Sequence, residues 1–429
     1  MSTTLPLKGI RVLELSVAWA APFCGKNLAY LGAEVVKVEA PYRPDGHRGS
    51  IFNPTPGVGA TYPQGEPGER PWNRTGTFHE RYRSKLDISL DLAKPEGRDA
   101  FRELVGVSDV VLVNYRAGVM DNLGLGYDAL KEINPQIIMA LLPGFGLTGP
   151  YRDYSSYGSN LEALTGAMGL TGYPDRDPLN SNLTWPDPMV GVMAMGMICA
   201  AIRHRKTRGE GMLVEFSQME ATVRAMAGFL MDYQMNGRVA QRDGNRHPIY
   251  APHGVFRCKG DDQWLAVVVR YDHEWEALCK VMGKPELSHD PRFADCLARL
   301  HHVDDVERVV EAWTMTQDKV EAMRALQQAG VAAGPVMPHY EHFTNPQYQA
   351  RGVFQEISHP EAGTFLFQGI AGYRLSKTPG YNQRHAPLFG EHNRYLLHDV
   401  LGMTEDQVAD LEKKEVISEV PLGENARSA

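Results

Sequence analysis

The sequence predicts an α/β fold with a parallel sheet in a doubly wound layer. Between residues 10 and 142, short apolar segments rich in strand-forming residues alternate with segments of helical pattern. Strands that alternate with helices favour a parallel sheet covered by helices. The chain has 429 residues, of which 43% are hydrophobic, so it can bury a large core but is too long for one compact unit of ordinary size. We therefore expect at least two lobes.

The expected elements follow one another in a regular order. The apolar run IRVLEL at residues 10–15 predicts the first strand, and a helix over 20–31 and a strand over 34–38 follow it. The pattern then predicts a helix over 93–106, a strand over 108–114, a helix over 127–134, a strand over 135–142, a helix over 187–204, a strand over 212–217 and a helix over 218–235.

Two polar stretches interrupt this pattern. Residues 41–78 are dense in Pro, Gly and Arg, and so long a loop is usually functional or an interface arm. Residues 236–252 are turn-rich and mark a boundary. The predicted organisation is a large domain over 1–225, a small α+β domain over 226–345 with a strand pair at 254–258 and 264–269, and a C-terminal segment over 346–429 that returns to the large domain.

Composition excludes several classes of protein. The net charge of −8 and the pI near 6.0 give no basic excess for a nucleic-acid partner, so an anionic ligand needs a local cationic pocket. The five cysteines are odd in number and lack a CxxC pair, which disfavours a disulfide framework or a zinc site. We see no signal peptide, and the most membrane-like stretch, 188–202, is too short to span a bilayer. We expect a cytoplasmic protein without a membrane partner.

The GFGLTG segment at residues 144–149 matches the GxGxxG dinucleotide pattern only weakly. It follows a late strand rather than the first one, and Pro150 and Tyr151 stand where a helix should open. The first strand-to-helix turn, SVAWAAP, has no such glycines. We interpret residues 144–149 as a tight loop at the carboxyl edge of a sheet, where α/β folds place their ligands.

Asp187 is the carboxylate of most interest, in the segment TWPDPMVGVMAMGMICAAIRHRK. Pro188 follows it, and because Pro is favoured at the first helical position, Asp187 is expected at the N-cap. An Asp there needs no further role. The same position would favour an ionised carboxylate, which a nucleophile must be. Position alone leaves both interpretations open. The small residues that follow, Gly191 to Ala201, indicate tight packing more than a ligand.

Several segments, taken in their order, resemble the class III CoA-transferases, the family that includes formyl-CoA transferase and carnitine CoA-transferase. The opening LKGIRVLELSVAWAAPFCGKNLAYLGAEVVKVEAP and the stretch RSKLDISLDLAKPEGRDAFRELVGVSDVVLVNYRAGVMDNLGLGYDAL resemble its first and central parts. SYGSNLEALTGAMGLTGYP, the Asp187 helix and RHRKTRGEG resemble its catalytic segment, and AGVAAGPV and APLFGEHN its C-terminal part. The resemblance covers nearly the whole chain.

The resemblance implies a fold and a mechanism. It implies a large Rossmann-like domain, a smaller domain and two interlocked subunits, as a homodimer or with a homologous subunit. It also implies that Asp187 attacks the thioester of an acyl-CoA, and that a mixed anhydride and then an aspartyl-CoA thioester form before a carboxylic acid takes the CoA. No metal and no tightly bound cofactor are implied; the partners are acyl-CoA and a carboxylic acid.

The matching positions imply a set of binding residues. For CoA these are Val17, Ala18 and Ala20 on the first turn, Lys85 near the nucleotide phosphates, Asn114 at a strand end, and Arg116 after it. Trp19 and Phe145 are assigned to the substrate pocket.

The chain also departs from formyl-CoA transferase. Val17 and Trp19 replace His and Gln, Ala40 and Asn122 replace two arginines, and Pro143 replaces a Lys. The glycine-rich loop expected near residues 245–255 is replaced by GNRHPIYAPHG.

These departures predict that oxalate is not the substrate. Trp19 suggests an apolar or larger acyl group, and we hypothesise a dicarboxylic or aryl-substituted acid with succinyl-CoA as donor. Two alternatives stay open. The α-methylacyl-CoA racemases use a His about thirty residues before the Asp, where this chain has Tyr157, and two-base proton exchange needs that second group. A non-catalytic partner subunit would be expected to lack the nucleophile, and Asp187 is present.

Overall fold

The computed structural model describes residues 4–49, 61–369 and 372–423. These residues form two compact units. The first comprises residues up to 167, residues 180–235 and residues from 349 onward, and the second comprises residues 168–179 and 236–348. Each unit is described by itself below.

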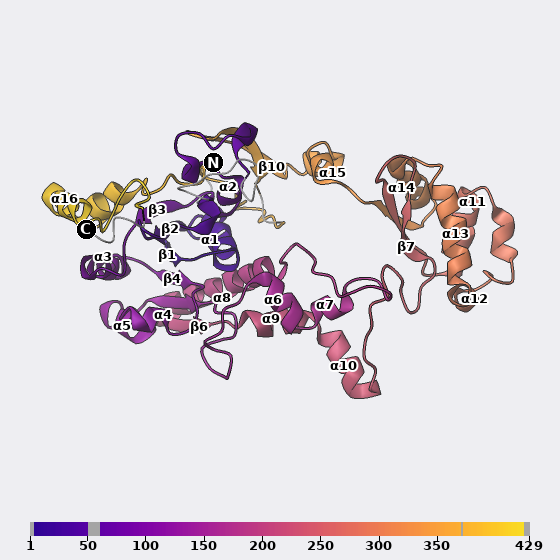
Figure 1. Cartoon of the computed structure of the whole chain (residues 1–429), viewed down its shortest axis with the longest axis horizontal. Helices are drawn as coiled ribbons and strands as arrows, with labels where there is room; N and C mark the ends of the chain where they lie inside the picture. Colours follow the sequence, from indigo (N-terminus) through magenta and orange to yellow (C-terminus); the bar gives the residue numbers. More distant parts are fainter. Residues whose placement is uncertain (1–3, 50–60, 370–371, 424–429) are drawn as a thin grey trace. The chain divides into compact units, whose positions relative to one another are not determined.

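A six-stranded sheet is the centre of the first unit (Figure 1). Its strands are β1 (Arg11–Leu15), β2 (Glu34–Glu39), β3 (Leu86–Ser89), β4 (Val110–Val113), β5 (Ile138–Leu141) and β6 (Met212–Glu215). The strand order is β3-β2-β1-β4-β5-β6, and every pairing is parallel. This is the order of the doubly wound dinucleotide-binding folds, in which the chain reverses its winding between β1 and β4.

Helices and short turns connect and cover these strands. They are α1 (Ala20–Tyr30), α2 (Gly76–Tyr82), α3 (Pro95–Gly106), α4 (Val119–Asn122), α5 (Tyr127–Ile133), α6 (Gly158–Leu164), α8 (Pro186–Arg208), α9 (Gln218–Ala225) and α16 (Glu405–Lys413). Three further helices cross the limits between the two units along the chain: α7 (Ala167–Leu170), α10 (Ala227–Asn236) and α15 (Pro346–Ala350). A 3₁₀ turn at Gly46–Arg48 follows β2, and a π-helical segment spans Tyr395–Val400.

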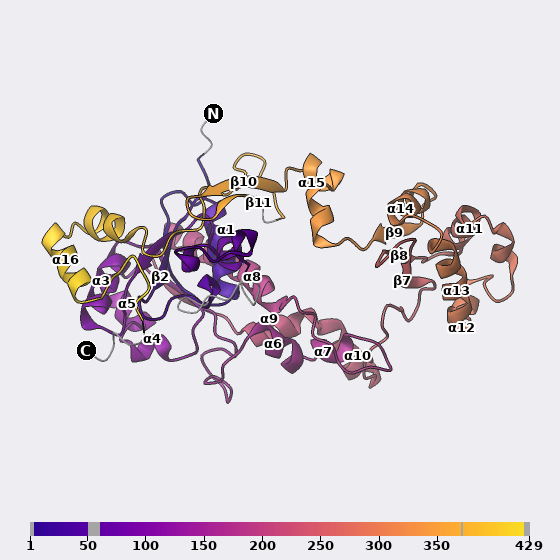
Figure 2. The same ribbon diagram turned by 45° about the horizontal axis from the view of Figure 1, so that its top comes forward.

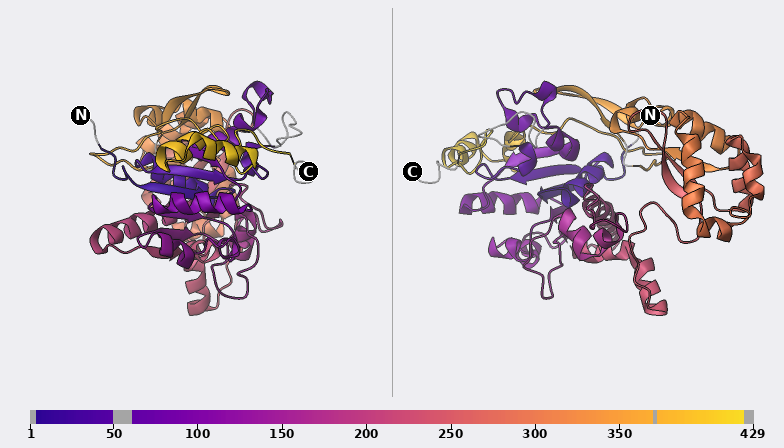
Figure 3. Two further views of the ribbon diagram at one scale, coloured as in Figure 1. Left: turned by 90° about the vertical axis from the view of Figure 1, so that its left-hand side faces the viewer. Right: turned by 45° about the vertical axis from the view of Figure 1, so that its right-hand side comes forward.

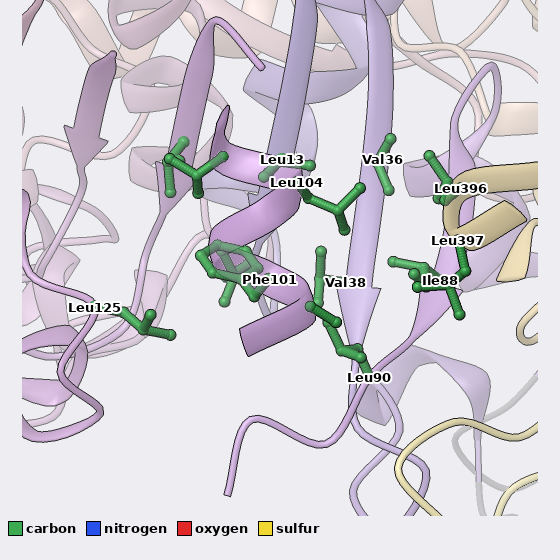
Figure 4. Packing of buried hydrophobic residues seen from close by; sticks show 14 of the residues in the cluster. Leu13, Val36, Val38, Ile88, Leu90, Phe101, Leu104, Leu125, Leu396 and Leu397 are labelled. Carbon is green, nitrogen blue, oxygen red and sulfur yellow. The ribbon is translucent and has the colours of Figure 1, made fainter. Parts of the chain in front are cut away.

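Each face of the sheet packs against its own helices (Figure 3). On one face, side chains of β1 to β5 meet α3, α5, the π-helical segment and α16, and Phe101, Leu104 and Leu396 lie among the strand residues (Figure 4). On the other face, α1 and α8 cover β1, β4 and β5. Because both faces are buried, the strands read as apolar runs rather than as alternating sequences.

Seven charged side chains are buried around β1, β2 and β3, and we call them the ion-pair cluster. They are Glu14, Lys37, Glu39, Asp45, Arg48, Lys85 and Asp87, each 6% exposed or less. Lys85 Nζ lies 2.7 Å from Glu14, Lys37 Nζ lies 2.9 Å from Asp45, and Arg48 contacts both Glu39 and Asp87. Every member of the cluster therefore has an opposite charge beside it.

A hairpin of β10 (Phe354–His359) and β11 (Gly363–Gln368) also belongs to the first unit (Figure 2). Its end and the segment after it are tied to α2: Arg83 donates to the backbone of Gln368 and to Asn382. His79, His359 and His385 pack ring against ring at this junction, with centroids 4.3 and 5.1 Å apart.

The second unit is smaller and mixes α and β structure. Its antiparallel sheet has the order β7 (His253–Arg257), β8 (Trp264–Val268), β9 (Ala332–Pro335). The helices around it are α11 (Asp272–Val281), α12 (Cys296–His301), α13 (Val303–Thr314) and α14 (Lys319–Gln328). Trp275 and Phe293 pack edge to face in its core.

The predicted fold class is confirmed: a six-stranded parallel sheet carries the large unit, and the first strands and helices lie where the pattern places them. Three local predictions differ. The sequence analysis missed β3 and β9, and the expected helix over 218–235 is divided into α9 and α10 at Met226. Part of the predicted loop over 41–78 lies outside the described residues; the rest includes the 3₁₀ turn at Gly46–Arg48 and the start of α2. Among the described residues, no helix combines the length and apolarity that a membrane crossing needs.

Candidate active site

The site begins where the sheet reverses its winding, at the carboxyl ends of β1 and β4. Val17, just after β1, donates its backbone N–H to the Asn114 side chain at 2.9 Å, and Asn114 donates back to the Val17 carbonyl at 2.7 Å. Asn114 directly follows β4. In open α/β sheets, ligands bind at this kind of crevice. Two predicted residues that are far apart in sequence are thus joined.

The turn after β1 is bent to bring backbone to this edge. Ala18 has φ +60°, a left-handed conformation that a non-glycine residue rarely adopts. Trp19 is the N-cap of α1, and Ala20 is its first residue. Such backbone outliers are costly and gather at functional sites. Asn182 (φ +57°) and Thr184 (φ +44°), on the loop before Asp187, are two more.

Asp187 lies in the first turn of α8, but not at the N-cap. The N-cap is Trp185, Pro186 is the first helical residue, and Asp187 follows it, so the predicted N-cap position is wrong by two residues. The sequence WPDP holds two prolines, and the earlier one opens the helix. Gly191 lies one turn further on. A Cβ on Gly191 would come 2.7 Å from the Ala20 carbonyl, so only glycine lets α8 approach the start of α1 this closely.

The small residues of α8 divide into two groups. Gly191, Ala194 and Ala201 are buried against the sheet side of the unit, as the packing interpretation predicts. Gly196 and Ala200 are exposed, so close packing does not explain them.

The Asp187 carboxylate is buried and unpaired. The residue is 7% exposed, and no described residue donates a hydrogen bond to its side chain. Burial raises its pKa from 3.8 to about 6; the positive charge of Arg81 opposes this shift and the negative charge of Glu162 adds to it. Burial therefore outweighs the help that a helix N-terminus gives to the ionised form. At neutral pH the carboxylate is still mostly ionised, and its lone pairs are free.

Glu162, on α6, is the second buried carboxylate of this region. It accepts hydrogen bonds from the Ser181 backbone N–H at 3.0 Å and from the Ser181 hydroxyl at 2.7 Å. Gly158, at the start of α6, packs on Thr184, where a Cβ would come within 2.6 Å of the threonine side chain. Helix α6 thus fixes the loop that precedes Asp187. Tyr157 caps α6 and is 67% exposed.

Arg81, on α2, places a positive charge in the site. Its guanidinium lies 4.8 Å from the centre of the Trp19 ring, and Nη1 donates to the Ala18 carbonyl at 3.4 Å. Nη1 also contacts Nε2 of His47. The Trp19 ring, which is predicted to line the substrate pocket, therefore makes a cation–π contact with Arg81.

Lys85, predicted to lie near the nucleotide phosphates, has its charge paired inside the unit. Its side chain is wholly buried, and Nζ is held by both Glu14 oxygens, at 2.7 and 2.8 Å, and by the Pro22 carbonyl at 2.9 Å. A phosphate would have to displace Glu14 to reach it. The charge of Lys85 is neutralised within the ion-pair cluster here, and its role near the phosphates stays a prediction.

Arg116 is exposed and lines a cavity of about 230 Å³ beside the ends of β4 and β5. Arg152 lines the same cavity, together with Asp121 and Asp128.

Phe145 is buried in the loop after β5, where the rings of Tyr151 and Tyr154 meet it edge-on at 5.9 and 6.2 Å. The segment 144–149 is a loop and opens no helix, as expected.

Residues 7–393 match the family described as CoA-transferase family III. The chain belongs to this family. A succinyl-CoA–D-citramalate CoA-transferase of Chloroflexus aurantiacus is 35% identical over 96% of this chain and 98% of its own length. The beta subunit of a succinyl-CoA–L-malate CoA-transferase from the same organism is 33% identical over 97% of this chain and 99% of its own length. A CaiB/BaiF family protein from Brucella suis, known from a crystal structure, is 31% identical and superimposes with a TM-score of 0.81 over 92% of this chain and all of its own.

The roles predicted from the sequence for the site residues stay predictions, but the structure brings several of these residues together. Asp187, the turn at Val17 to Ala20, and Asn114 come together at one end of the sheet. Arg81 and Glu162 were missed. Nothing in the sequence distinguishes either of them from a solvated side chain, because their role depends on how α2 and α6 lie against the start of α8.

Proposed function

We propose that this CoA-transferase moves CoA from succinyl-CoA to a dicarboxylic acid through an aspartyl-CoA thioester on Asp187. The observation that carries the proposal is the buried, unpaired carboxylate at the start of α8. A carboxylate with no hydrogen bond to break and a pKa below neutrality is both ionised and nucleophilic.

In the proposed reaction, Asp187 is the only protein group that forms covalent bonds with the substrates. Its carboxylate attacks the thioester carbonyl of the donor, which gives a mixed anhydride and CoA thiolate. The thiolate attacks the Asp187 carbonyl of that anhydride, and the donor acid leaves as a carboxylate. The acceptor carboxylate then attacks the aspartyl-CoA thioester, and the released thiolate attacks the acceptor's own carbonyl, which restores Asp187. Covalent catalysis of this kind divides one difficult exchange into easier ones.

The CoA path is proposed along the carboxyl edge of the sheet. The backbone of Val17, Ala18 and Ala20 faces this edge, and Asn114 holds it in place. The cavity beside Arg116 and Arg152 suits the nucleotide phosphates, because guanidinium groups bind phosphate oxygens by paired hydrogen bonds. These two arginines would replace those that Ala40 and Asn122 remove.

The acids are proposed from the relatives and from Trp19. Both relatives named above are described as acting with succinyl-CoA, and D-citramalate and L-malate are dicarboxylic acids. Trp19 and Phe145 would form the walls of the acyl pocket. An acceptor panel of D-citramalate, L-malate, glutarate, oxalate and benzylsuccinate tests this choice. Fastest turnover with oxalate would contradict it.

We also propose a dimer, formed by two copies or with a homologous subunit, in the reducing cytoplasm. Helix α10 buries none of its residues, and Phe229, Leu230, Met231 and Tyr233 are each about half exposed or more. So apolar a helix is typical of a covered surface. All five cysteines are free. Light scattering of the purified chain tests the assembly, and a monomer at micromolar concentration would contradict a homodimer.

The central test is to trap the intermediate. The protein is incubated with succinyl-CoA, treated with hydroxylamine or borohydride, and the modified residue is mapped by mass spectrometry. We expect modification of Asp187 and none in Asp187→Ala. A label on another residue would overturn the mechanism. Deuterium uptake at the acyl α-carbon without an acceptor would favour the racemase alternative, and absence of exchange by the chain alone would favour a partner-subunit role.

A further inference from the structure

Arg81, like Asp187, is a charged side chain of the site with no close ion-pair partner among the described residues. Its side chain is 18% exposed, and the nearest carboxylate oxygen, on Glu80, lies 4.0 Å from Nε. Glu80 is itself engaged by Lys26, whose Nζ lies 2.5 Å away. By contrast, Arg48 in the ion-pair cluster contacts two carboxylates. A mostly buried guanidinium without a counter-ion is costly unless a ligand supplies one.

The free part of the guanidinium is its outer edge. The hydrogen bonds of Arg81 to the Ala18 carbonyl and to His47 both use Nη1. Nη2 makes no hydrogen bond within the described residues, and Nε has only the distant Glu80. Nε and Nη2 together form the fork that binds a carboxylate through two parallel hydrogen bonds. An orphaned donor lies beside it, because Nε1 of Trp19 is buried without an acceptor in the described part of the chain.

The position of Arg81 is fixed from behind by His47 and Asp45. A guanidinium can only donate, so Nε2 of His47 accepts from Arg81. The proton of the neutral ring is then on Nδ1, which lies 3.0 Å from Asp45 Oδ1. The other oxygen of Asp45 is held by Lys37 at 2.9 Å and by the Tyr82 hydroxyl at 2.5 Å. The chain Asp45–His47–Arg81 therefore anchors the cation to the ion-pair cluster.

We propose that Arg81 is the specificity-determining residue that binds the distal carboxylate of a dicarboxylic acyl group while its other carbonyl reacts at Asp187. The inference rests on the proposed function and adds the residue that selects the acid. Arg81 lies close enough to act electrostatically on Asp187, and its guanidinium lies 4.8 Å from the centre of the Trp19 ring. His47 is a positioning residue for Arg81.

A competing role for Arg81 is to keep Asp187 ionised or to hold α2 in place. Either role would serve every acyl-CoA alike. A role in binding the distal carboxylate serves only acyl groups that have one. Succinyl-CoA and butyryl-CoA separate these roles, because their acyl chains have the same length and differ only in a carboxylate against a methyl group.

The experiment measures the donor half-reaction alone, without an acceptor. Wild type, Arg81→Met and Arg81→Lys are mixed with succinyl-CoA or butyryl-CoA, and the rate of Asp187 modification is followed by mass spectrometry. We expect Arg81→Met to lose about 100-fold or more with succinyl-CoA, since removing one partner of a buried charge pair is severe, and to change by less than about threefold with butyryl-CoA. Arg81→Lys should recover part of the loss. His47→Ala should raise the succinyl-CoA concentration needed for half-maximal rate more than it lowers the maximal rate.

Arg116→Met is the matched control, since Arg116 is an arginine at the same end of the sheet that the proposed function places on CoA. It should slow both substrates by the same factor. Equal losses for both substrates in Arg81→Met would overturn the inference while the proposed function stands. If neither acyl-CoA modifies Asp187 in the wild type, the proposed function fails and the inference fails with it. Both the proposed function and the inference are supported if succinyl-CoA modifies Asp187 in the wild type and if Arg81→Met sharply lowers the rate with succinyl-CoA relative to the rate with butyryl-CoA.

Discussion

Two regions of the same unit contain buried charged side chains, and they differ in whether these charges are paired. In the ion-pair cluster, Lys85 and Arg48 each touch carboxylate oxygens within hydrogen-bonding distance. In the candidate site, no described residue donates a hydrogen bond to the Asp187 carboxylate, and no carboxylate oxygen of the described residues lies closer than 4.0 Å to Arg81. The two regions meet at Asp45, which belongs to the cluster and holds His47 behind Arg81.

The contrast separates structural charges from reactive ones. A buried pair that is fully hydrogen-bonded can be retained without any chemistry, whereas a buried charge left unpaired costs free energy. The site bears that cost at both Asp187 and Arg81. A substrate that brings an electrophilic carbonyl to the first and a carboxylate to the second would remove it. Substitutions in the paired region should therefore change stability, and substitutions in the unpaired region should change the reaction rate.

The largest effect is expected for Asp187→Asn. Removal of the nucleophile should lower CoA transfer by at least ~10⁴-fold. Stability should stay unchanged or rise by about 1 kcal/mol at pH 8, because burial raises the pKa of Asp187 to about 6 and the neutral amide avoids the cost of the buried charge. Steady-state transfer rates and urea unfolding measure the two effects.

Asp99→Asn provides the control for this substitution. Asp99 is an exposed carboxylate on α3, paired with Arg102, and its loss should leave both rate and stability almost unchanged. Asp187→Asn that keeps a tenth of the activity, or that unfolds at much lower urea, would remove the distinction between the two regions.

In the paired region, Lys85→Met should lower the stability of the fold, whereas Asp187→Asn lowers the rate of CoA transfer. It leaves Glu14 buried without its counter-charge, and breaking such a pair costs about 3–5 kcal/mol in the free energy of unfolding. The double variant Glu14→Gln/Lys85→Met should recover more than half of that loss. Urea denaturation of these two variants, of Glu14→Gln alone and of the wild type completes the double-mutant cycle. A Lys85→Met protein of wild-type stability but weak CoA binding would instead support the predicted role of Lys85 near the phosphates.

Lys85 shows what sequence can and cannot supply. The strand and helix order, the sheet and Asp187 follow from local patterns and ordered motifs, because periodicity and punctuation are properties of neighbouring residues. Whether a Lys faces solvent or a buried Glu seventy residues away is a property of packing. Arg81 was invisible for the same reason, since its role comes from contacts with Trp19, Ala18 and His47, which lie on other segments. The error at the N-cap of α8 has a local cause. The segment holds two prolines, and the helix begins at Pro186 rather than at Pro188.

Acid should weaken the paired region through the histidines packed against it. Burial lowers the pKa of His79 from 6.5 to about 4, and that of His359 to about 2, with the charges of Arg48 and His385 adding to both shifts. Because the unfolded chain binds protons near pH 6.5 and the folded chain does not, stability falls as pH drops from about 6.5 toward 4.

The loss from His79 alone should reach about 3 kcal/mol at pH 4. Urea midpoints measured between pH 4 and 8 test this, and His79→Gln should flatten the dependence. Carboxylates held by strong pairs, such as Asp45, would lose their contribution only at lower pH, because the pKa of Asp45 lies well below its usual range. A midpoint independent of pH in this window would contradict the assignment.

In the unpaired region, acid should lower the rate of Asp187 modification rather than the stability of the fold. We call this fall in rate at low pH the acid limb. The Asp187 carboxylate must be ionised to attack, and its pKa is about 6. The second-order rate of modification by succinyl-CoA should therefore fall about tenfold per pH unit below pH 6 and level off above pH 7. The positive charge of Arg81 lowers this pKa, so Arg81→Met should move the limb to higher pH. A limb that stays in place would show that Arg81 is too far from Asp187 to act on it.

The smallest effect is expected for Asn114→Ala. Asn114 holds both the N–H and the carbonyl of Val17, and each such hydrogen bond contributes about 1 kcal/mol. Its loss should loosen the turn that presents backbone to CoA and raise the KM for succinyl-CoA about tenfold, with a small change in kcat. Asn134→Ala is the matched control, because Asn134 likewise makes two side-chain hydrogen bonds to backbone, in its case by donating to the carbonyls of Val105 and Ser108 at the amino end of β4. Both variants should lose similar stability, and only the first should raise KM. If both raise KM equally, the effect is a general loosening of the sheet; if only Asn114→Ala does, the carboxyl end of β4 is where CoA binds.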